Sequence, residues 1–320
     1  MTQPLVSIIT VNFNGRELTL ELLQSIFSNS YKNLEVIVVD NGSAADPSPT
    51  LRRHFPLAKV VRSRDNLGFA GGNNLGLQHA TGNYIFFVNN DAELTDGVIE
   101  SLLQLFHANP RLGAASPKLC YFNVLKGDIP DCIQYAGSTP VHPLTGRNRT
   151  IGYREADLGQ YDQPRPTAYC HGAAMMVPRH VIEQVGPMAE DYFLYYEELD
   201  WCERIRSAGY EIWVDNRVRV YHKESITVNR LGSLKTYYLH RNRMLFMRRH
   251  RSMSALAVFF SFVAFVTLPK NAIIYLLRGQ WSELRAFLRA LWWNLTHGSQ
   301  PAIPTTALHS NEERKLMPFQ

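Results

Sequence analysis

Short apolar runs alternate with segments of helical period along the first third of the chain. Apolar runs that end in turn-forming residues predict buried strands at 5–11, 35–40, 59–62 and 84–88. Apolar residues at helical spacing predict helices at 17–27, 71–79 and 96–108. A strand–helix–strand unit returns the chain to the same end of the sheet, so its two strands are parallel. The pattern therefore predicts an α/β fold with a mostly parallel central sheet.

The middle of the chain is less regular. Strands are predicted near 113–121 and at 173–177, 211–214 and 217–221, and helices at 179–185 and 199–208. The stretch 123–167 is rich in proline, glycine and charge and has no helical period. It predicts a long irregular insertion, and insertions of this length are usually functional.

The last part of the chain is aromatic, basic and apolar. A helix is predicted at 233–250, followed by an apolar run at 253–268, Pro269-Lys270 and a second apolar run at 272–277. The first run is slightly shorter than the roughly 20 residues that span a bilayer. A buried helix, a helix that dips into or lies on the membrane, a short kinked hairpin, and a span that continues to 277 all remain open. Interfacial anchors are predicted at Trp281, Trp292, Trp293, Arg278, Arg285 and Arg289.

Charge and cysteine content indicate which partners and which redox environment suit the chain. The 320 residues carry a formal net charge of +5. Basic residues crowd beside the apolar run and fit an anionic membrane surface or phosphate groups: Arg241, Arg243, Arg248, Arg249, His250 and Arg251. No nucleic-acid motif accompanies them, so no nucleic-acid partner is expected. The four cysteines form no CxxC pair, which predicts a reducing cytosol, and the N-terminus has no signal-peptide pattern.

Polar residues follow the first two predicted strands. Thr10, Asn12 and Asn14 end the first strand, and Asp40 ends the second. Ligands of open parallel sheets bind beyond the carboxyl ends of the strands, and Asp40 can accept from a base N–H or a ribose hydroxyl. Ordinary turn chemistry is the alternative.

A glycine-rich stretch at 65–76 follows Arg64. Its glycines allow close backbone approach, and the start of its helix offers free N–H groups to phosphate. The stretch does not fit GxGxxG and does not follow the first strand, which argues against a dinucleotide-dependent oxidoreductase.

Acidic and amide side chains mark two further segments. The strand at 84–88 ends in Asn89, Asn90 and Asp91, whose oxygens suit Mg²⁺ or Mn²⁺, although a plain turn is the alternative. Glu197 and Glu198 follow an aromatic run, and crowded carboxylates raise one another's pKa, so one can act as a general base. The alternative is a solvated helix N-terminus. Asp200 and Glu203, with Arg204, are assigned structural roles.

The order of these motifs resembles the family 2 glycosyltransferases, most closely the bacterial rhamnosyltransferase-like members that build cell-surface polysaccharides. The resemblance spans roughly 5–250 and rests on VSIITVNFN, EVIVVDNGS, NLGFAGGNN, FVNNDAEL, YFLYYEELDWCERIRSAGY and VYHKES. It implies a GT-A fold with a C-terminal helical, membrane-associating extension.

The resemblance also implies roles for individual residues. Asp40 corresponds to the base-reading aspartate, with Thr10 and Asn12 in the same pocket. The loop under the donor ribose and diphosphate corresponds to Arg64, Asn66, Gly68 and Asn73. The metal ligands correspond to Asn89 and Asp91, at the two ends of the family's DxD motif, and to His222. Glu198 corresponds to the catalytic base.

Two positions depart from the family pattern, and further residues complete the predicted site. Asn89 replaces the first DxD acid, and Glu198 replaces the usual aspartate. His171 is expected to border the acceptor, and a sugar-stacking platform is predicted from Tyr192, Phe193, Tyr195, Tyr196 and Trp201. Substrate binding is also predicted for Asn14, Asn90 and Glu197.

These observations predict an inverting, metal-dependent glycosyltransferase that adds one sugar, since the QxxRW motif of processive synthases is absent from the sequence. The resemblance implies a nucleotide-diphosphate sugar as the donor, and dTDP-rhamnose or a UDP-sugar is expected, although the residues themselves do not separate these from GDP-linked donors. The expected acceptor is a polyprenyl-diphosphate-linked glycan at the cytoplasmic face of the inner membrane, and a homodimer is among the expected partners. The predicted domains are 1–230 (nucleotide half 1–92, acceptor half 93–230), helices at 231–300 and a flexible tail at 301–320. A non-catalytic sugar-nucleotide or glycan-binding module and a nucleotidyltransferase are the alternatives.

Overall fold

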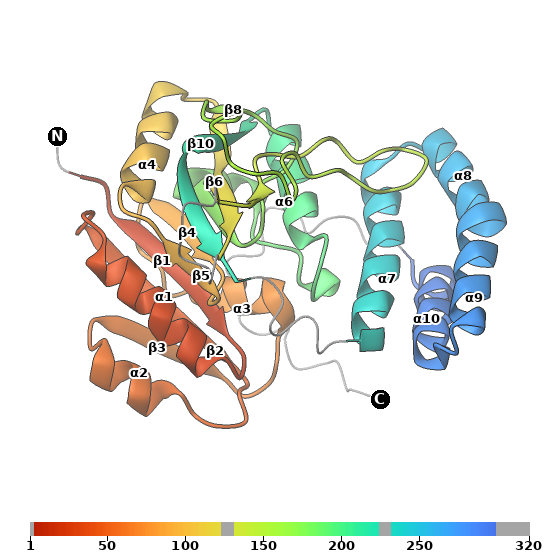
Figure 1. The fold of residues 1–320 in the computed structure, drawn as a ribbon, viewed down its shortest axis with the longest axis horizontal. Helices are drawn as coiled ribbons and strands as arrows, with labels where there is room; N and C mark the ends of the chain where they lie inside the picture. The colour runs from red at the N-terminus through yellow and green to blue at the C-terminus, as the bar shows by residue number, and fades with distance from the viewer. Residues whose placement is uncertain (1–2, 123–130, 224–231, 299–320) are drawn as a thin grey trace.

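The computed structural model describes residues 3–122, 131–223 and 232–298 (Figure 1). The predicted tail at 301–320 lies outside these residues. Within them, one mixed sheet has the strand order β3-β2-β1-β4-β9-β6-β10-β5, with β7 beside β6 and β8 beside β10.

The first half of the sheet is parallel, as predicted. β1 (Val6–Asn12) pairs in parallel with β2 (Leu34–Asn41) and β4 (Tyr84–Val88), and β2 pairs with β3 (Ala58–Ser63). The predicted helices are confirmed as α1 (Arg16–Ser28), α3 (Gly68–Leu77) and α4 (Val98–Ala108). The register sets Asn12 beside Asp40, so the two predicted strand tips lie side by side.

The second half of the sheet is mixed. β9 (Ala174–Pro178) runs antiparallel to both β4 and β6 (Leu112–Tyr121), and β5 (Ala92–Leu94) runs antiparallel to β10 (Glu211–His222). The prediction of separate strands at 211–214 and 217–221 is wrong. A bulge between Asp215 and Arg219 takes up the extra residues while pairing with β6 continues on both sides, so one strand results.

The described part of the predicted insertion is more ordered than expected; residues 123–130 lie outside the described residues. β7 (Ile133–Tyr135) pairs with β6, and β8 (Arg165–Pro166) pairs with β10. Lys118 of β6 holds the insertion, because its buried Nζ lies 2.8 Å from Asp157 Oδ2 and 2.6 Å from Asp162 Oδ1.

Helices cover the sheet, and the core forms a layer on each face of it. Alternate residues of β1 divide between the two layers, Ile9 in one and Ile8 in the other. Besides the helices already given, the covering elements are α2 (Ser48–His54), which was not predicted, α5 (Arg179–Val185), the short 3₁₀ helix η1 (Glu190–Tyr192) and α6 (Glu197–Ser207).

The C-terminal helices lie to one side of the sheet (Figure 1). They are α7 (Gly232–His250), α8 (Met253–Phe262), the π-helical turn η3 (Val263–Thr267), α9 (Leu268–Leu277) and α10 (Trp281–Thr296). The helix continues through Pro269, which was one of the alternatives left open. This proline falls in the first turn of α9, where its missing N–H is tolerated, and the preceding π turn keeps the chain helical.

Met253–Leu277 therefore forms one continuous 25-residue helical segment, and among the described residues it alone is long and apolar enough to cross a membrane. Only 6% of its most apolar window is buried, so the buried-helix alternative does not hold within this chain. Phe265 is 81% exposed, as is Met253, and Leu277 is 83% exposed.

The basic stretch of α7 turns inward, contrary to the expected surface patch. Arg249 pairs with Asp191, His250 Nε2 lies 2.7 Å from Asp200 Oδ1, and Arg251 lies 3.1 Å from Glu203. Acidic residues of η1 and α6 lie against the end of α7 and neutralise these cations. Most of this stretch thus fixes α7 to the sheet domain instead of facing a membrane.

Candidate active site

The nucleotide-binding residues predicted at the tips of β1 and β2 do lie together. Asn12 Nδ2 donates to Asp40 Oδ1 at 3.0 Å, and Arg62 Nε lies 3.1 Å from the other carboxylate oxygen. Asn14 joins the two loops, because its Oδ1 accepts from the backbone N–H of Ala44 at 3.0 Å. Thr10 is 0% exposed, so it lies beneath this edge.

Phe13 belongs to the same edge and was not predicted. It is 37% exposed although it is a large apolar side chain, and it stands between Asn12 and Asn14. An exposed aromatic ring offers a stacking face to a planar ligand. The signal was present in the motif VNFN, where an aromatic residue interrupts the polar strand tip.

The glycine-rich loop contacts the loop between η1 and α6. Gly68 begins α3 with a φ of +73°, and an added Cβ would overlap the Phe193 carbonyl oxygen. Phe69 N–H donates to that oxygen at 2.6 Å. Asn66 Oδ1 accepts from Gly68 N–H at 2.9 Å, and Arg64 is exposed nearby in the chain. Glycine is therefore required here both for its φ and for close approach.

Two predicted substrate-binding asparagines have structural contacts. Asn73 is 2% exposed and donates to Phe69 O within α3 at 3.0 Å. Asn90 Nδ2 lies 3.2 Å from Thr19 Oγ1 and 3.4 Å from Gly15 O at the start of α1. Both amides therefore hold backbone segments in place.

The predicted metal ligands converge. β10 pairs with β5 so that His222 lies opposite Ala92, next to the strand tip. His222 Nε2 lies 3.1 Å from Asp91 Oδ1 and 3.4 Å from Asn89 Nδ2. Burial opposes ionisation of Asp91, but the hydrogen bond and charge of His222 outweigh it and lower the pKa of the carboxyl. The carboxylate, the imidazole and an amide can supply the oxygen and nitrogen ligands of a divalent cation.

Gln134 supports this group from the insertion and was not predicted. Its Oε1 lies 2.9 Å from His222 Nδ1. A proton on Nδ1 donated to this oxygen leaves Nε2 free to bind a cation, an arrangement that metal-binding histidines commonly show. No described group of three or more His, Cys, Asp or Glu side chains is placed to hold a metal, so the candidate centre depends on an amide ligand.

The predicted base lies at the start of α6. Burial raises the pKa of Glu198 to about 7 against the opposing effect of backbone N–H groups. Burial and then the charge of Glu198 raise the pKa of Glu197 well above its usual value. Each side chain has a buried Oε2 without a hydrogen-bond partner among the described residues. Glu198 is therefore the carboxyl that ionises near neutral pH.

His171 and Gly172 connect the base to the candidate metal ligands. A Cβ added to Gly172 would lie 3.9 Å from Glu198 Cβ, and the rings of His171 and His222 have centroids 6.1 Å apart. Burial, and next the charge of His222, lower the pKa of His171 to about 3, so this ring is neutral. Its Nδ1 accepts from Ala173 N–H at 3.1 Å, which leaves Nε2 as a donor.

Comparisons with known proteins identify the family of the chain and its fold. The family model described as "Glycosyl transferase family 2" matches residues 7–186, more than half of the chain. The chain belongs to glycosyltransferase family 2.

Two curated relatives and one solved structure show how far the similarity of this family 2 glycosyltransferase extends. The chain is 28% identical over 247 residues to the low-salt glycan biosynthesis hexosyltransferase Agl10 of Haloferax volcanii, and the match covers 75% of this chain and 74% of that protein. It is 24% identical over 224 residues to the N-acetylglucosaminyl-diphospho-decaprenol L-rhamnosyltransferase of Mycobacterium tuberculosis, covering 64% and 72%.

The solved structure is the mannosyltransferase PcManGT from Pyrobaculum calidifontis, determined in complex with GDP-Man and Mn²⁺. It matches with a TM-score of 0.55 at 18% identity, covering 92% of this chain and 88% of that one. The likeness shows a common GT-A fold.

The prediction that Trp201 forms part of a sugar-stacking platform in this family 2 glycosyltransferase is wrong. Trp201 is 0% exposed, its Nε1–H donates to Gly186 O at 2.9 Å, and its ring meets the edge of Phe87. Tyr192 is also 0% exposed. Trp201 of α6 and Tyr192 of η1 both point into the core, so neither ring has a face free for a sugar.

Asn242 of α7 organises the loop before the base and was not predicted. Its Nδ2 lies 2.9 Å from Tyr192 O and 2.8 Å from the carbonyl oxygens of Leu194 and Tyr195. The loop is strained, because Phe193, Tyr195 and Tyr196 have φ values of 62°, 71° and 76°. Such a backbone persists only where its surroundings hold it.

Proposed function

We propose that this glycosyltransferase moves one sugar from a nucleoside-diphosphate donor to a hydroxyl of a lipid-linked glycan, with inversion at the anomeric carbon. One observation carries the proposal. Glu198, with a pKa of about 7, lies against Gly172, and the adjacent His171 ring contacts the His222–Asp91 pair. A base beside a group that can hold a cation is what a single displacement with a charged leaving group requires.

The tips of β1 and β2 would bind the donor nucleoside, with Asp40 accepting from the base and Phe13 stacking on it. Arg64, Asn66 and Gly68 would contact the ribose and diphosphate. The GDP-Man held by PcManGT and the rhamnosyltransferase relative support a nucleotide-sugar donor. dTDP-rhamnose and UDP-sugars are the donors to test first.

Asn89, Asp91 and His222 would hold Mg²⁺ or Mn²⁺ through an amide oxygen, a carboxylate oxygen and Nε2. A divalent cation bound there neutralises charge that develops on the departing diphosphate. The Mn²⁺ of PcManGT supports this assignment. Gln134 would fix the tautomer of His222 by accepting from Nδ1.

Glu198 then acts as the base. Its carboxylate takes the proton of the acceptor hydroxyl, and that oxygen attacks the anomeric carbon from the face opposite the diphosphate. The bond to the diphosphate oxygen breaks, and its electron pair leaves with that oxygen. One displacement inverts the anomeric centre without a covalent enzyme intermediate. Burial and then the charge of Glu198 raise the pKa of Glu197 well above its usual value, which favours the protonated form of Glu197 over that of an ordinary carboxyl.

The acceptor is proposed to be a polyprenyl-diphosphate-linked glycan at the cytoplasmic face of the inner membrane. Residues 1–230 would form the catalytic domain, with halves 1–92 and 93–230, and the helices at 231–300 would hold it to the bilayer. The decaprenol-linked substrate named for the mycobacterial relative and the exposed apolar segment Met253–Leu277 support this location.

The test compares Glu198→Gln with Glu197→Gln. Glutamine mimics a protonated glutamate, so Glu197→Gln should keep most of its activity, whereas Glu198→Gln should lose about 10²–10⁴-fold in transfer rate. Donor affinity, measured by thermal shift with Mn²⁺ or Mg²⁺, should be similar in both variants.

Three results would contradict the proposal: normal turnover by Glu198→Gln, donor binding without transfer by the wild type under any metal, or release of pyrophosphate from a nucleoside triphosphate.

A further inference from the structure

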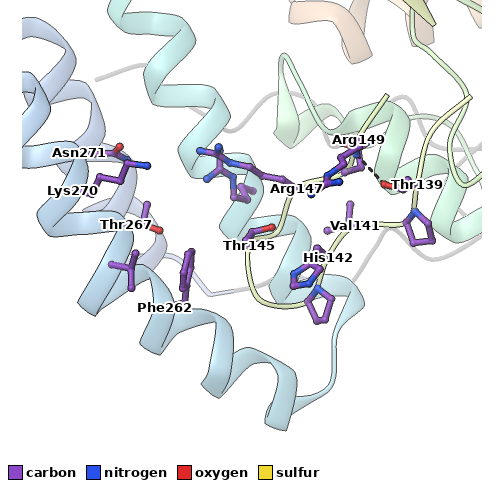
Figure 2. A pocket seen from close by; sticks show the side chains of 15 residues that line it. Thr139, Val141, His142, Thr145, Arg147, Arg149, Phe262, Thr267, Lys270 and Asn271 are labelled. Atoms are coloured by element: carbon purple, nitrogen blue, oxygen red, sulfur yellow. Dashed lines mark hydrogen bonds between the residues drawn. The ribbon is translucent and has the colours of Figure 1, made fainter. Parts of the chain in front are cut away.

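A cavity of about 720 Å³ lies between the insertion and the C-terminal helices, apart from the strand tips (Figure 2). The loop 139–149 forms one wall. Arg243 of α7 and residues from Phe262 to Asn271 form the other. Figure 2 shows Arg147 and Arg149 on the loop side and Lys270 on the helix side. The volume lies in the range of sites for small ligands.

Among the described residues, the walls of the cavity carry positive charge and no acidic side chain. Arg147, Arg149, Arg243 and Lys270 line it, and none of its 15 lining residues is acidic. On the opposite face of α7 positive charge is balanced, since Arg249 pairs with Asp191 there.

The positive charge of the cavity helps to lower the pKa of groups in and beside it. The charge of Arg243, followed by burial, lowers the pKa of Arg147. Burial and then the charges of Arg243 and Arg147 lower the pKa of His240 to about 3. Cations held this close together repel one another and favour binding of an anion.

The cavity is joined to the segment that carries the base. Tyr196 OH donates to Gly146 O in the cavity loop at 2.8 Å, and Arg243 Nε lies 3.4 Å from the same hydroxyl. Tyr196 immediately precedes Glu197 and Glu198 at the start of α6.

The helix wall belongs to the same apolar segment that exposes Phe265. Phe262 and Val266 line the cavity, whereas Phe265 of the same turns is 81% exposed. The cavity thus lies between the candidate base and the helix suited to contact lipid.

We propose that this cavity binds the phosphate groups of the lipid that carries the acceptor, which rests on the function proposed above. Guanidinium groups bind phosphate oxygens in bidentate fashion, and an ammonium adds a point charge. The apolar side chains Phe262 and Val266 receive the first carbons of the lipid chain. The site therefore selects an acceptor with charged phosphate beside a hydrocarbon tail, and it presents the attached sugar toward Glu198.

The experiment uses the full chain in detergent with two acceptors that carry the same sugar, one on a short prenyl diphosphate and one on a neutral alkyl chain. The double variant Arg147→Gln/Lys270→Gln removes two cavity charges. The ratio of KM for the diphosphate acceptor to KM for the neutral acceptor should rise at least about tenfold, which corresponds to about 1.4 kcal/mol.

The control removes equal charge elsewhere. Arg52→Gln/Arg53→Gln, on the exposed side of α2, should leave the ratio as in the wild type. An unchanged ratio in the cavity variant, with transfer intact, overturns this inference and leaves the proposed function standing. Absence of transfer by the wild type to either acceptor overturns both.

Flotation with phosphatidylglycerol vesicles separates the two sources of lipid phosphate. If the cavity variant loses vesicle binding while its KM ratio in detergent stays at the wild-type value, the cations serve the membrane surface and the proposal is wrong. Loss of the KM discrimination, with vesicle binding equal to that of the control variant, supports it.

Discussion

Replacing Asn242 with alanine should damage catalysis more than it damages the fold. Asn242 is 0% exposed on α7, and its amide lies within 2.8–2.9 Å of three carbonyl oxygens in the loop before the base. An NH₂ group has two hydrogens, so these contacts amount to about two hydrogen bonds. The third carbonyl oxygen must share one of these two hydrogens with another carbonyl.

The magnitude follows from what the substitution leaves behind. Each lost hydrogen bond costs about 1 kcal/mol, and a buried carbonyl left without a partner costs about 1–3 kcal/mol. Some carbonyls will regain partners when the loop moves, so the expected loss of unfolding free energy is about 2–4 kcal/mol.

That movement is what affects the reaction. Tyr195 and Tyr196 have positive φ values and directly precede Glu197 and Glu198, so relaxation of the loop turns the start of α6. A displacement of about 1 Å at a reacting group can cost about 10²-fold in rate. We expect kcat to fall by about that factor while donor affinity changes little.

The assay pairs urea unfolding with steady-state transfer, and Asn294→Ala is the matched control. Asn294 is also a buried asparagine, but it donates to Arg241 O and Ala290 O and does not contact the loop. The acid limb of the pH–rate profile should shift only in Asn242→Ala, because only there do the surroundings of Glu198 change. If both variants lose equal activity for equal loss of stability, the positioning argument is refuted.

Three further results are expected. Since burial raises the pKa of Glu198 to about 7 and the ionised form is the base, kcat/KM for the acceptor should rise with pH through about 7; a flat profile would exclude this carboxyl. Asn89→Asp adds a carboxylate beside Asp91 and should lower the Mn²⁺ concentration for half-maximal activity by about tenfold, a change that metal titration would show or disprove. Lys118→Met removes the closer of the two cations beside the buried Asp157 and leaves Arg219 at 3.7 Å, so it should cost up to about 3 kcal/mol in chemical denaturation; a loss under about 1 kcal/mol would mean that the Lys118 pair is dispensable.

The order of strands and helices could be predicted where local period decides the structure. β4 and α5 begin and end at the predicted residues, because the local pattern of apolar residues in each segment already shows which side chains must be buried. The sequence did not predict β7 or β8, nor the joining of the predicted strands 211–214 and 217–221 into the single bulged β10, because these features depend on pairing with β6 and with each other. Pairing partners distant in the chain leave no local signal.

The sequence by itself determined which chemical groups stand at the strand tips. Asn12 and Asp40 were predicted to lie together because parallel strands end at one edge of the sheet, whereas the pairing of Asp91 with His222 was implied by the resemblance to the family 2 glycosyltransferases.

Only the tertiary structure decided which polar and aromatic groups face that edge. Trp201 packs into the core. The cations at the end of α7 pair with acids of η1 and α6. Gln134 hydrogen-bonds His222, and Asn242 hydrogen-bonds the loop before Glu198. Burial and hydrogen-bond partners depend on what packs against a residue, and that packing is set by contacts between segments far apart in the chain.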